Sequence, residues 1–192
     1  MNSTNSYKLA LVGRSGVGKS SFAMRVVTDV FTNDVEATIG ASFLTKNIRS
    51  ATDTGSCIQL QIWDTAGQER YNSLIPMYTR GAAIILLCIN SNDLNDLKKD
   101  IKTFKLENHS SQVIVVVTKI DEADALQYSS VIQYVNDMLY PVHFISSKTG
   151  EGIEALLDTI AEECLKTKPI EKPRITQAVS KSTLNESTCC YK

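Results

Sequence analysis

The sequence has no apolar run long enough to cross a membrane. The longest, Ala82 to Ile89, is far shorter than the roughly 20 residues that a spanning helix needs. The polar start, Met1 to Ser6, is not followed by the apolar stretch of a secretory signal peptide. We therefore expect neither a membrane span nor a leader, and we interpret the apolar run as a fully buried strand.

Neither sign of charge is in excess. The 192 residues include 20 Lys and Arg against 21 Asp and Glu, so no nucleic-acid partner is expected. The five cysteines have no regular spacing, and without a secretory signal they indicate a reducing compartment rather than a disulfide framework. With 43% hydrophobic residues, the chain can fill the core of one domain and carry a tail.

Short runs rich in Val and Ile alternate with helical patterns along most of the chain. The patterns predict strands at 7–12, 41–48, 57–63, 82–89, 113–117 and 142–145, and helices at 19–28, 93–108, 128–138 and 151–166. The second and third strands would form an antiparallel hairpin. This order predicts an α/β fold, with a mostly parallel six-stranded sheet, one antiparallel edge strand and helices on both faces.

The composition changes after Lys166. Residues 167–192 contain two prolines, many Ser and Thr, and almost no aromatic residues. Such a segment cannot bury enough apolar surface to offset its ordering entropy. We expect a short polar N-terminus at 1–6, one folded domain at 7–166 and a disordered tail at 167–192.

Residues 13–20, Gly-Arg-Ser-Gly-Val-Gly-Lys-Ser, fit the phosphate-binding pattern G-x-x-x-x-G-K-[ST]. The pattern stands between a predicted strand and a predicted helix, the context that supports it. Backbone N–H groups of such a loop face phosphate oxygens, and the helix N-terminus adds partial positive charge. Lys19 would reach the β- and γ-phosphates, and the Ser20 hydroxyl would bind Mg²⁺. The predicted nucleotide-binding residues here are Ser15, Gly16, Val17, Gly18, Lys19, Ser20 and Ser21.

Residues 63–71, Trp-Asp-Thr-Ala-Gly-Gln-Glu-Arg-Tyr, follow an apolar strand. An Asp at a strand end can hold magnesium through water, and a nearby Gly lets the backbone approach a γ-phosphate. The string resembles switch II of the Rab family of small GTPases, and the resemblance extends from Tyr7 to about Lys166. It implies a P-loop G domain that binds GTP or GDP with Mg²⁺. It also implies slow GTP hydrolysis, with Asp64 and Gly67 at the nucleotide and Gln68 as the catalytic residue that orients water.

Guanine recognition is predicted at residues 118–121 and 146–148. The Asp121 carboxylate can accept the guanine N1–H and N2–H, which adenine does not offer in that arrangement. The aliphatic parts of the Lys119 and Lys148 side chains can pack on the two faces of the base. The family reads NKxD and SAK here, whereas this chain has Thr118 for Asn and Ser147 for Ala; Rho-type relatives also use TKxD. The predicted base-site residues are Thr118, Lys119, Asp121, Ser146, Ser147 and Lys148.

Phe31 and Thr38, in the segment that follows the first predicted helix, match positions that contact the nucleotide in the family. The resemblance implies that Phe31 packs against the base, the alternative being a plain core Phe. It implies that Thr38 binds Mg²⁺ through its hydroxyl and the γ-phosphate through its N–H. The implied metal site is then Ser20, Thr38 and, through water, Asp64. Loss of the γ-phosphate would release this loop.

Residues 39–45 and 71–81 resemble the switch regions of early-endosomal Rabs. The resemblance implies that Phe43, Trp63 and Tyr78 form an aromatic triad for effectors; the alternative is that all three are core residues. Several features depart from that subgroup. The hairpin loop at 49–56 is longer than expected, the segment 121–140 is shorter, and residues 88–90 replace the usual Tyr-Asp pair.

The sequence ends in Cys189-Cys190-Tyr191-Lys192, which resembles the CCXX ending that Rabs use for double geranylgeranylation. Two lipid chains give stable anchoring where one does not; the alternative is two idle cysteines. The implied partners are a guanine nucleotide, an exchange factor, a GAP, effectors, and prenylation and GDI-type escort proteins. The implied protein is a monomer, cytoplasmic and peripheral on endomembranes, with the early endosome as the favoured site.

Two other functions share parts of this pattern. An interaction module would bind GTP without meaningful hydrolysis; Gln68 argues against it, although Ser15 lies where it could perturb access to the γ-phosphate. A metabolic P-loop kinase would need an acceptor pocket or a lid, and no insertion in the sequence is large enough to supply one.

Overall fold

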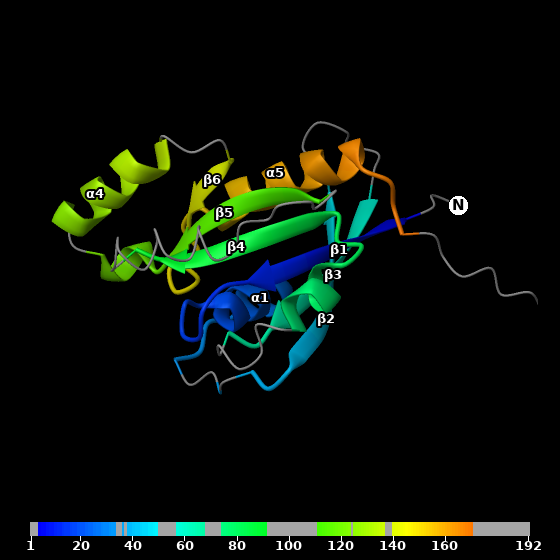
Figure 1. The fold of residues 1–192 in the computed structure, drawn as a ribbon, viewed down its shortest axis with the longest axis horizontal. Helices are drawn as coiled ribbons and strands as arrows, with labels where there is room; N and C mark the ends of the chain where they lie inside the picture. The colour runs from blue at the N-terminus through cyan, green and yellow to red at the C-terminus, as the bar shows by residue number, and fades with distance from the viewer. Residues whose placement is uncertain are drawn as a thin grey trace, which may run out of the picture.

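The computed structural model describes residues 4–33, 36, 38–49, 57–67, 74–91, 111–123, 125–136 and 140–170. Strands and helices alternate along them (Figure 1). The elements are β1 (Asn5–Val12), α1 (Lys19–Thr28), β2 (Ala41–Arg49), β3 (Cys57–Thr65), α2 (Ile75–Thr79), β4 (Ile84–Asn90), β5 (Gln112–Thr118), the 3₁₀ turn η2 (Ile120–Glu122), α4 (Ala125–Asn136), β6 (Val142–Phe144) and α5 (Ile153–Lys166).

The strands form one six-stranded sheet in the order β2-β3-β1-β4-β5-β6. The pairs β1–β3, β1–β4, β4–β5 and β5–β6 are parallel, and only the edge strand β2 is antiparallel to its neighbour. Figure 1 shows β2 at one edge and β6 at the other. The predicted fold class is therefore confirmed.

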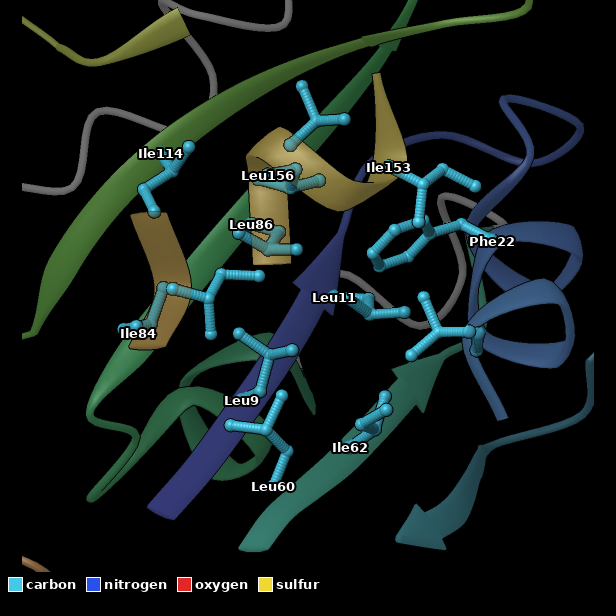
Figure 2. Packing of buried hydrophobic residues seen from close by; sticks show 14 of the residues in the cluster. Leu9, Leu11, Phe22, Leu60, Ile62, Ile84, Leu86, Ile114, Ile153 and Leu156 are labelled. Carbon is cyan, nitrogen blue, oxygen red and sulfur yellow. The ribbon is translucent and has the colours of Figure 1, made fainter. Parts of the chain in front are cut away.

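The core has two halves, one on each face of the sheet. Successive side chains of β1 point to opposite faces. Leu9 and Leu11 pack with residues of α1 and α5, whereas Ala10 and Val12 pack with residues of α4 and, at the margin, α2. Figure 2 shows the first half, with Phe22 of α1 lying between that helix and the sheet. Helices thus cover both faces, as the alternation predicts.

Several boundaries differ from the sequence-based prediction. The helix expected at 128–138 begins at Ala125, because Ala and Leu at its start are strong helix formers. The helix expected from 151 begins at Ile153, because Gly152 has a positive φ of 73° that no helix residue adopts. The helix expected at 93–108 and the hairpin loop at 50–56 lie outside the described residues.

The two ends of the described chain lie next to each other. β1 begins at Asn5, before the expected start of the folded domain, and the Ser6 hydroxyl donates a hydrogen bond to Gln59 Oε1 (3.0 Å). The described chain continues past Lys166 to Ile170, whose N–H donates to the Ser6 carbonyl (2.8 Å). The start of the tail is thus attached to β1.

The described cysteines are unpaired. Cys88 and Cys164 are buried and Cys57 is partly buried. Burial raises the pKa of both the Cys88 and Cys164 thiols to about 12, so both stay protonated at neutral pH. No described helix meets the length and apolarity of a membrane span.

Candidate functional site

A pocket lies where the parallel strands end. β1, β3, β4 and β5 run in one direction, so their carboxyl ends meet at one edge of the sheet, the usual ligand position in such folds. The pocket has a volume of about 290 Å³. All but Asn33, Glu36 and Thr65 of its lining residues were predicted from the sequence. The lining is Ser15, Gly16, Gly18, Lys19, Ser20, Ser21, Asn33, Glu36, Thr38, Thr65, Gly67 and Lys119.

Two glycines let backbone segments approach each other closely around this pocket. Gly13 has a φ of 141°, and a Cβ there would lie 2.2 Å from the Cys88 carbonyl oxygen. A Cβ at Gly67 would lie 2.4 Å from both the Arg14 carbonyl oxygen and Lys19 Nζ. Any side chain would therefore push the phosphate loop away from β4 or from the end of β3. The absence of a side chain at positions 13 and 67 therefore lets the loop pack closely against β4 and the end of β3.

Lys19 supplies a buried positive charge to the pocket. The side chain belongs to a residue that is only 5% exposed, at the first position of α1. Its ammonium group donates hydrogen bonds to the carbonyl oxygens of Gly13 (2.9 Å) and Arg14 (2.7 Å). These bonds stabilise the charge within the loop, beside the partly positive N-terminus of the helix. The arrangement attracts an anion such as phosphate.

Three hydroxyl groups converge on the carboxylate of Asp64, a residue only 2% exposed. Its Oδ2 atom accepts hydrogen bonds from Ser20 (2.6 Å), Thr38 (3.3 Å) and Ser42 (3.4 Å). The Ser20 and Thr38 hydroxyls also lie 2.8 Å apart. Burial raises the pKa of Asp64 above its usual range, while the hydrogen bond from Ser20 and the charge of Lys19 oppose that rise.

This oxygen cluster fits a magnesium ion. Asp64 Oδ1 is buried and has no hydrogen-bond partner among the described residues, so a lone pair remains for a cation or its water. Carboxylate and hydroxyl oxygens are the hard ligands that Mg²⁺ prefers, usually with several waters retained. The described residues hold no group of three or more His, Cys, Asp and Glu side chains. Binding of a cation at this site would therefore require the hydroxyl groups of Ser20 and Thr38 in addition to the Asp64 carboxylate.

The carboxylate of Asp121 is oriented by a buried serine. The Ser146 hydroxyl donates to Asp121 Oδ1 (2.5 Å) and accepts from the Thr149 N–H (3.1 Å). Ser146 is fully buried, whereas Asp121 is exposed. One carboxylate oxygen is thereby held by the Ser146 hydroxyl, while the residue as a whole stays exposed and can accept hydrogen bonds from a ligand. The structure thus brings together Asp121 and Ser146, two of the predicted base-site residues.

Thr118 ties the phosphate loop to the sheet. Its hydroxyl lies 2.5 Å from the Val17 carbonyl oxygen and 2.9 Å from that of Ile89, and its single proton serves one of them at a time. Thr118 and Val17 are both buried. Val17 packs its side chain into the core on the α1 and α5 face rather than lining the pocket. The Thr118 hydroxyl therefore links β5 to the Val17 carbonyl of the phosphate loop and to the Ile89 carbonyl of β4.

The other predicted base-site residues lie around the same edge. Lys119 has a left-handed backbone (φ 58°), and its ammonium group lies 3.9 Å from the Glu122 carboxylate. Ser147 is buried, and Lys148 is exposed. Phe31 is partly buried and, within the described residues, is found in neither core half nor the pocket lining. Its side chain is therefore not a plain core residue in this conformation.

The predicted aromatic triad includes one closely packed pair. Phe43 and Trp63 are cross-strand partners on β2 and β3, with ring centroids 5.5 Å apart and planes at 73°. This edge-to-face geometry is favourable for aromatic rings. Phe43 is 52% exposed, and Trp63 and Tyr78 are partly buried. The alternative that all three are core residues is therefore wrong.

Comparison with known proteins identifies the family. Residues 8–121 match the family model described as the Ras of Complex (Roc) domain of DAPkinase. The chain is 35% identical over 167 residues to GTP-binding protein ypt5 of Schizosaccharomyces pombe, covering 83% of this chain and 78% of that protein. It is 35% identical over 212 aligned positions to Ras-related protein Rab-5A of Dictyostelium discoideum, covering 99% of this chain and all of that protein. The chain belongs to the Rab family of small GTPases.

This Rab protein is accordingly a GTP hydrolase with a P-loop G domain. Four residues of the site were not predicted from the sequence: Asn33, Glu36 and Thr65 in the pocket lining, and Ser42 beside Asp64. Thr65 stands inside the recognised switch II string, and Ser42 is paired with Asp64 across the hairpin, so the hairpin register could have identified it. Gln68, Cys189 and Cys190 lie outside the described residues.

Proposed function

We propose that this Rab GTPase is a GTP-controlled switch in endosomal membrane traffic, active toward effectors when GTP is bound. The observation that carries the proposal is the convergence of Ser20 and Thr38 on the buried carboxylate of Asp64, beside Lys19. Three separate segments meet at these atoms: the start of α1, the loop before β2, and the end of β3. A ligand that engages them together can set the position of that loop.

The nucleotide is proposed to lie with its phosphates along the Gly-rich loop. Lys19 and the backbone of residues 15–18 would bind the β- and γ-phosphates, and the N–H of Thr38 the γ-phosphate. Ser20, Thr38 and, through water, Asp64 would hold Mg²⁺, which neutralises phosphate charge when bound. Gly67 allows the backbone to approach the terminal phosphate. Loss of that phosphate would free the Thr38 loop, which is the switching step.

The base is proposed to lie beside Lys119, the one predicted base-site residue among the described residues that line the pocket. Asp121, held by Ser146, would accept the N1–H and N2–H of guanine. The Lys119 and Lys148 stems would cover the two faces of the ring, Phe31 would contact its edge region, and the N–H of Ser147 would bind the base oxygen. This geometry excludes ATP because adenine presents no such pair of donors to a carboxylate.

Hydrolysis is proposed to depend on Gln68, which would orient the attacking water. Without an arginine finger from a GAP, turnover is expected at about 10⁻⁴–10⁻³ s⁻¹, and a GAP would add roughly 10³–10⁵-fold. The cycle further implies an exchange factor and GDI-type escort proteins. Phe43, Trp63 and Tyr78 would contact effectors, and Cys189 and Cys190 would carry the lipids that hold a monomer on the cytosolic face of endosomes.

The first test is nucleotide binding by the purified protein in the presence of Mg²⁺. We expect tight binding of labelled GTP and GDP, no competition by ATP, and weaker binding when Mg²⁺ is chelated, because the oxygen cluster around Asp64 then lacks its cation. Weak binding of GTP, or binding of ATP equal to that of GTP, would contradict the proposed base site and the switch with it.

A Gln68→Leu variant tests the proposed hydrolysis step. Leucine fills a similar volume but cannot hydrogen-bond to water, so single-turnover hydrolysis is expected to slow roughly 10- to 100-fold while GTP affinity is retained. The measurement is phosphate release from preloaded protein. Equal rates for the wild type and the variant would show that Gln68 does not orient the water.

A further inference from the structure

Lys8 makes two contacts that join separate parts of the sheet surface. Its ammonium nitrogen lies 4.4 Å from the centroid of the Trp63 ring. The same nitrogen donates a 3.0 Å hydrogen bond to the carbonyl oxygen of Arg80, the residue that caps the end of α2. One side chain on β1 thus contacts both the indole on β3 and the last turn after α2.

The strand register accounts for this position. β1 and β3 are parallel, with Ala10 opposite Trp63 and Lys8 opposite Gln61. Lys8 and Ala10 are two residues apart and share one face of the sheet, so Lys8 is a diagonal neighbour of the indole. Lys8 is partly buried, and this burial lowers the pKa of its ammonium group below the usual range. Attraction between a cation and an aromatic face strengthens in such surroundings.

The indole ring depends on its neighbours for its orientation. The Trp63 Nε1 atom is buried and has no hydrogen-bond partner among the described residues. The ring packs edge-to-face with Phe43, and the ammonium group of Lys8 lies over it. Phe43 is half exposed, as is Met77 on α2. The ring is therefore held between an exposed aromatic side chain and a residue bonded to the end of α2.

We propose that Lys8 is a positioning residue that couples the end of α2 to the Phe43–Trp63 pair, so that a displacement of α2 between nucleotide states reaches the indole ring. Gly67 lines the pocket and α2 begins at Ile75, eight residues later in the chain, so a change at the terminal phosphate would act near the start of α2. The inference rests on the proposed GTP-controlled function, because it requires two nucleotide states.

Trp63 is the one tryptophan of the sequence, so intrinsic fluorescence reports on this ring alone. The experiment compares emission and acrylamide quenching of the full chain with GDP bound and with a non-hydrolysable GTP analogue bound. The variants are Lys8→Met, which keeps the stem and removes the charge, and Lys8→Arg, which keeps a cation and a donor. Lys46→Met is the matched control, since Lys46 lies on β2 of the same sheet and its ammonium has no contact with Trp63 or α2 among those described.

We expect the wild type to show different emission in the two nucleotide states. Lys8→Met should lose most of that difference and show about twofold stronger quenching, because the ring is less firmly held. Lys8→Arg and Lys46→Met should behave like the wild type. Nucleotide affinity should stay within about twofold in every variant, since neither Lys8 nor Lys46 is among the described residues that line the pocket.

Two results would overturn the inference while leaving the proposed function intact. One is an unchanged emission difference in Lys8→Met; the other is identical emission in both states of a wild type that binds GTP and GDP normally. Failure of the wild type to bind guanine nucleotides would instead overturn the proposed function. If Lys8→Met does not fold, as judged by circular dichroism, Lys8→Gln replaces it under the same criteria.

Discussion

Replacing Asp121 by asparagine is expected to weaken GTP binding by roughly 10²–10⁴-fold, because two hydrogen bonds to a charged acceptor are lost, each worth about 1.5–3 kcal/mol. The Ser146 hydroxyl fixes one carboxylate oxygen at 2.5 Å, so the side chain cannot rotate freely to compensate. An asparagine amide would also place its own donor against a donor of guanine. Xanthine offers a carbonyl at that position, so xanthosine triphosphate should bind better to the variant than to the wild type.

The neighbouring carboxylate provides the control. Glu122 is exposed and lies 3.9 Å from the Lys119 ammonium, a surface pair that contributes at most about 1 kcal/mol. Glu122→Gln should therefore change GTP affinity only a few-fold. Competition binding with GTP and xanthosine triphosphate measures both variants. Comparable losses in the two variants, or a GTP affinity unaffected by Asp121→Asn, would show that Asp121 does not read the base.

A Gly13→Ala substitution is expected to destabilise the domain by roughly 2–6 kcal/mol. A methyl group there would overlap the Cys88 carbonyl oxygen at 2.2 Å, and alanine would have to adopt a φ of 141°. Such backbone strain costs about 1–3 kcal/mol, and overpacking adds about 1–3 kcal/mol. At about 2–4 °C per kcal/mol for a domain of this size, the melting temperature should fall by roughly 4–24 °C. The loop would move away from β4, so nucleotide affinity should fall as well.

Gly81→Ala separates conformational strain from steric overlap. Gly81 also has a positive φ, 70°, but a Cβ there would meet no atom within 4 Å. In Gly81→Ala the one expected cost is therefore the left-handed backbone conformation of alanine, which lowers the free energy of unfolding by about 1–2 kcal/mol. Melting curves of both variants should be recorded without nucleotide and at one fixed GDP concentration, because bound ligand itself raises the melting temperature. If the two variants lost the same stability, the close approach of Gly13 to β4 would not be the cause.

The elements set by local sequence were predictable. Lys19 begins and Thr28 ends α1, as the pattern predicts, because a glycine precedes this helix and its apolar positions repeat with helical spacing. The two buried strands β4 and β5 were found within two residues at each end, since continuous Val and Ile runs mark strands buried on both faces. The phosphate loop was recognised from spacing alone, because its chemistry lies within eight consecutive residues.

Contacts between distant segments were not predictable from one sequence. The Thr118 hydroxyl meets the Val17 carbonyl across 101 residues, and Lys8 meets Arg80 across 72. Periodicity shows which face of a strand is buried but not which neighbour a side chain finds there. Those contacts depend on the order of the strands in the sheet. The lengths of the segments that connect the strands are compatible with several orders, so the sequence alone does not determine it. Ser42 could be placed beside Asp64 only once the hairpin register was known.

The bond between Ile170 and Ser6 has a mechanical consequence. A pulling force applied through the C-terminal segment would meet this backbone hydrogen bond first, and from there would act on β1, the strand between β3 and β4. The hydrogen bonds that join β1 to β3 and β4 lie across the strand direction, so a load along β1 would shear them. β1 ends at the phosphate loop, roughly 20 Å from Ser6 at the usual rise per residue. Tension on the tail would therefore act at the start of β1, and phosphate binding would act at its end.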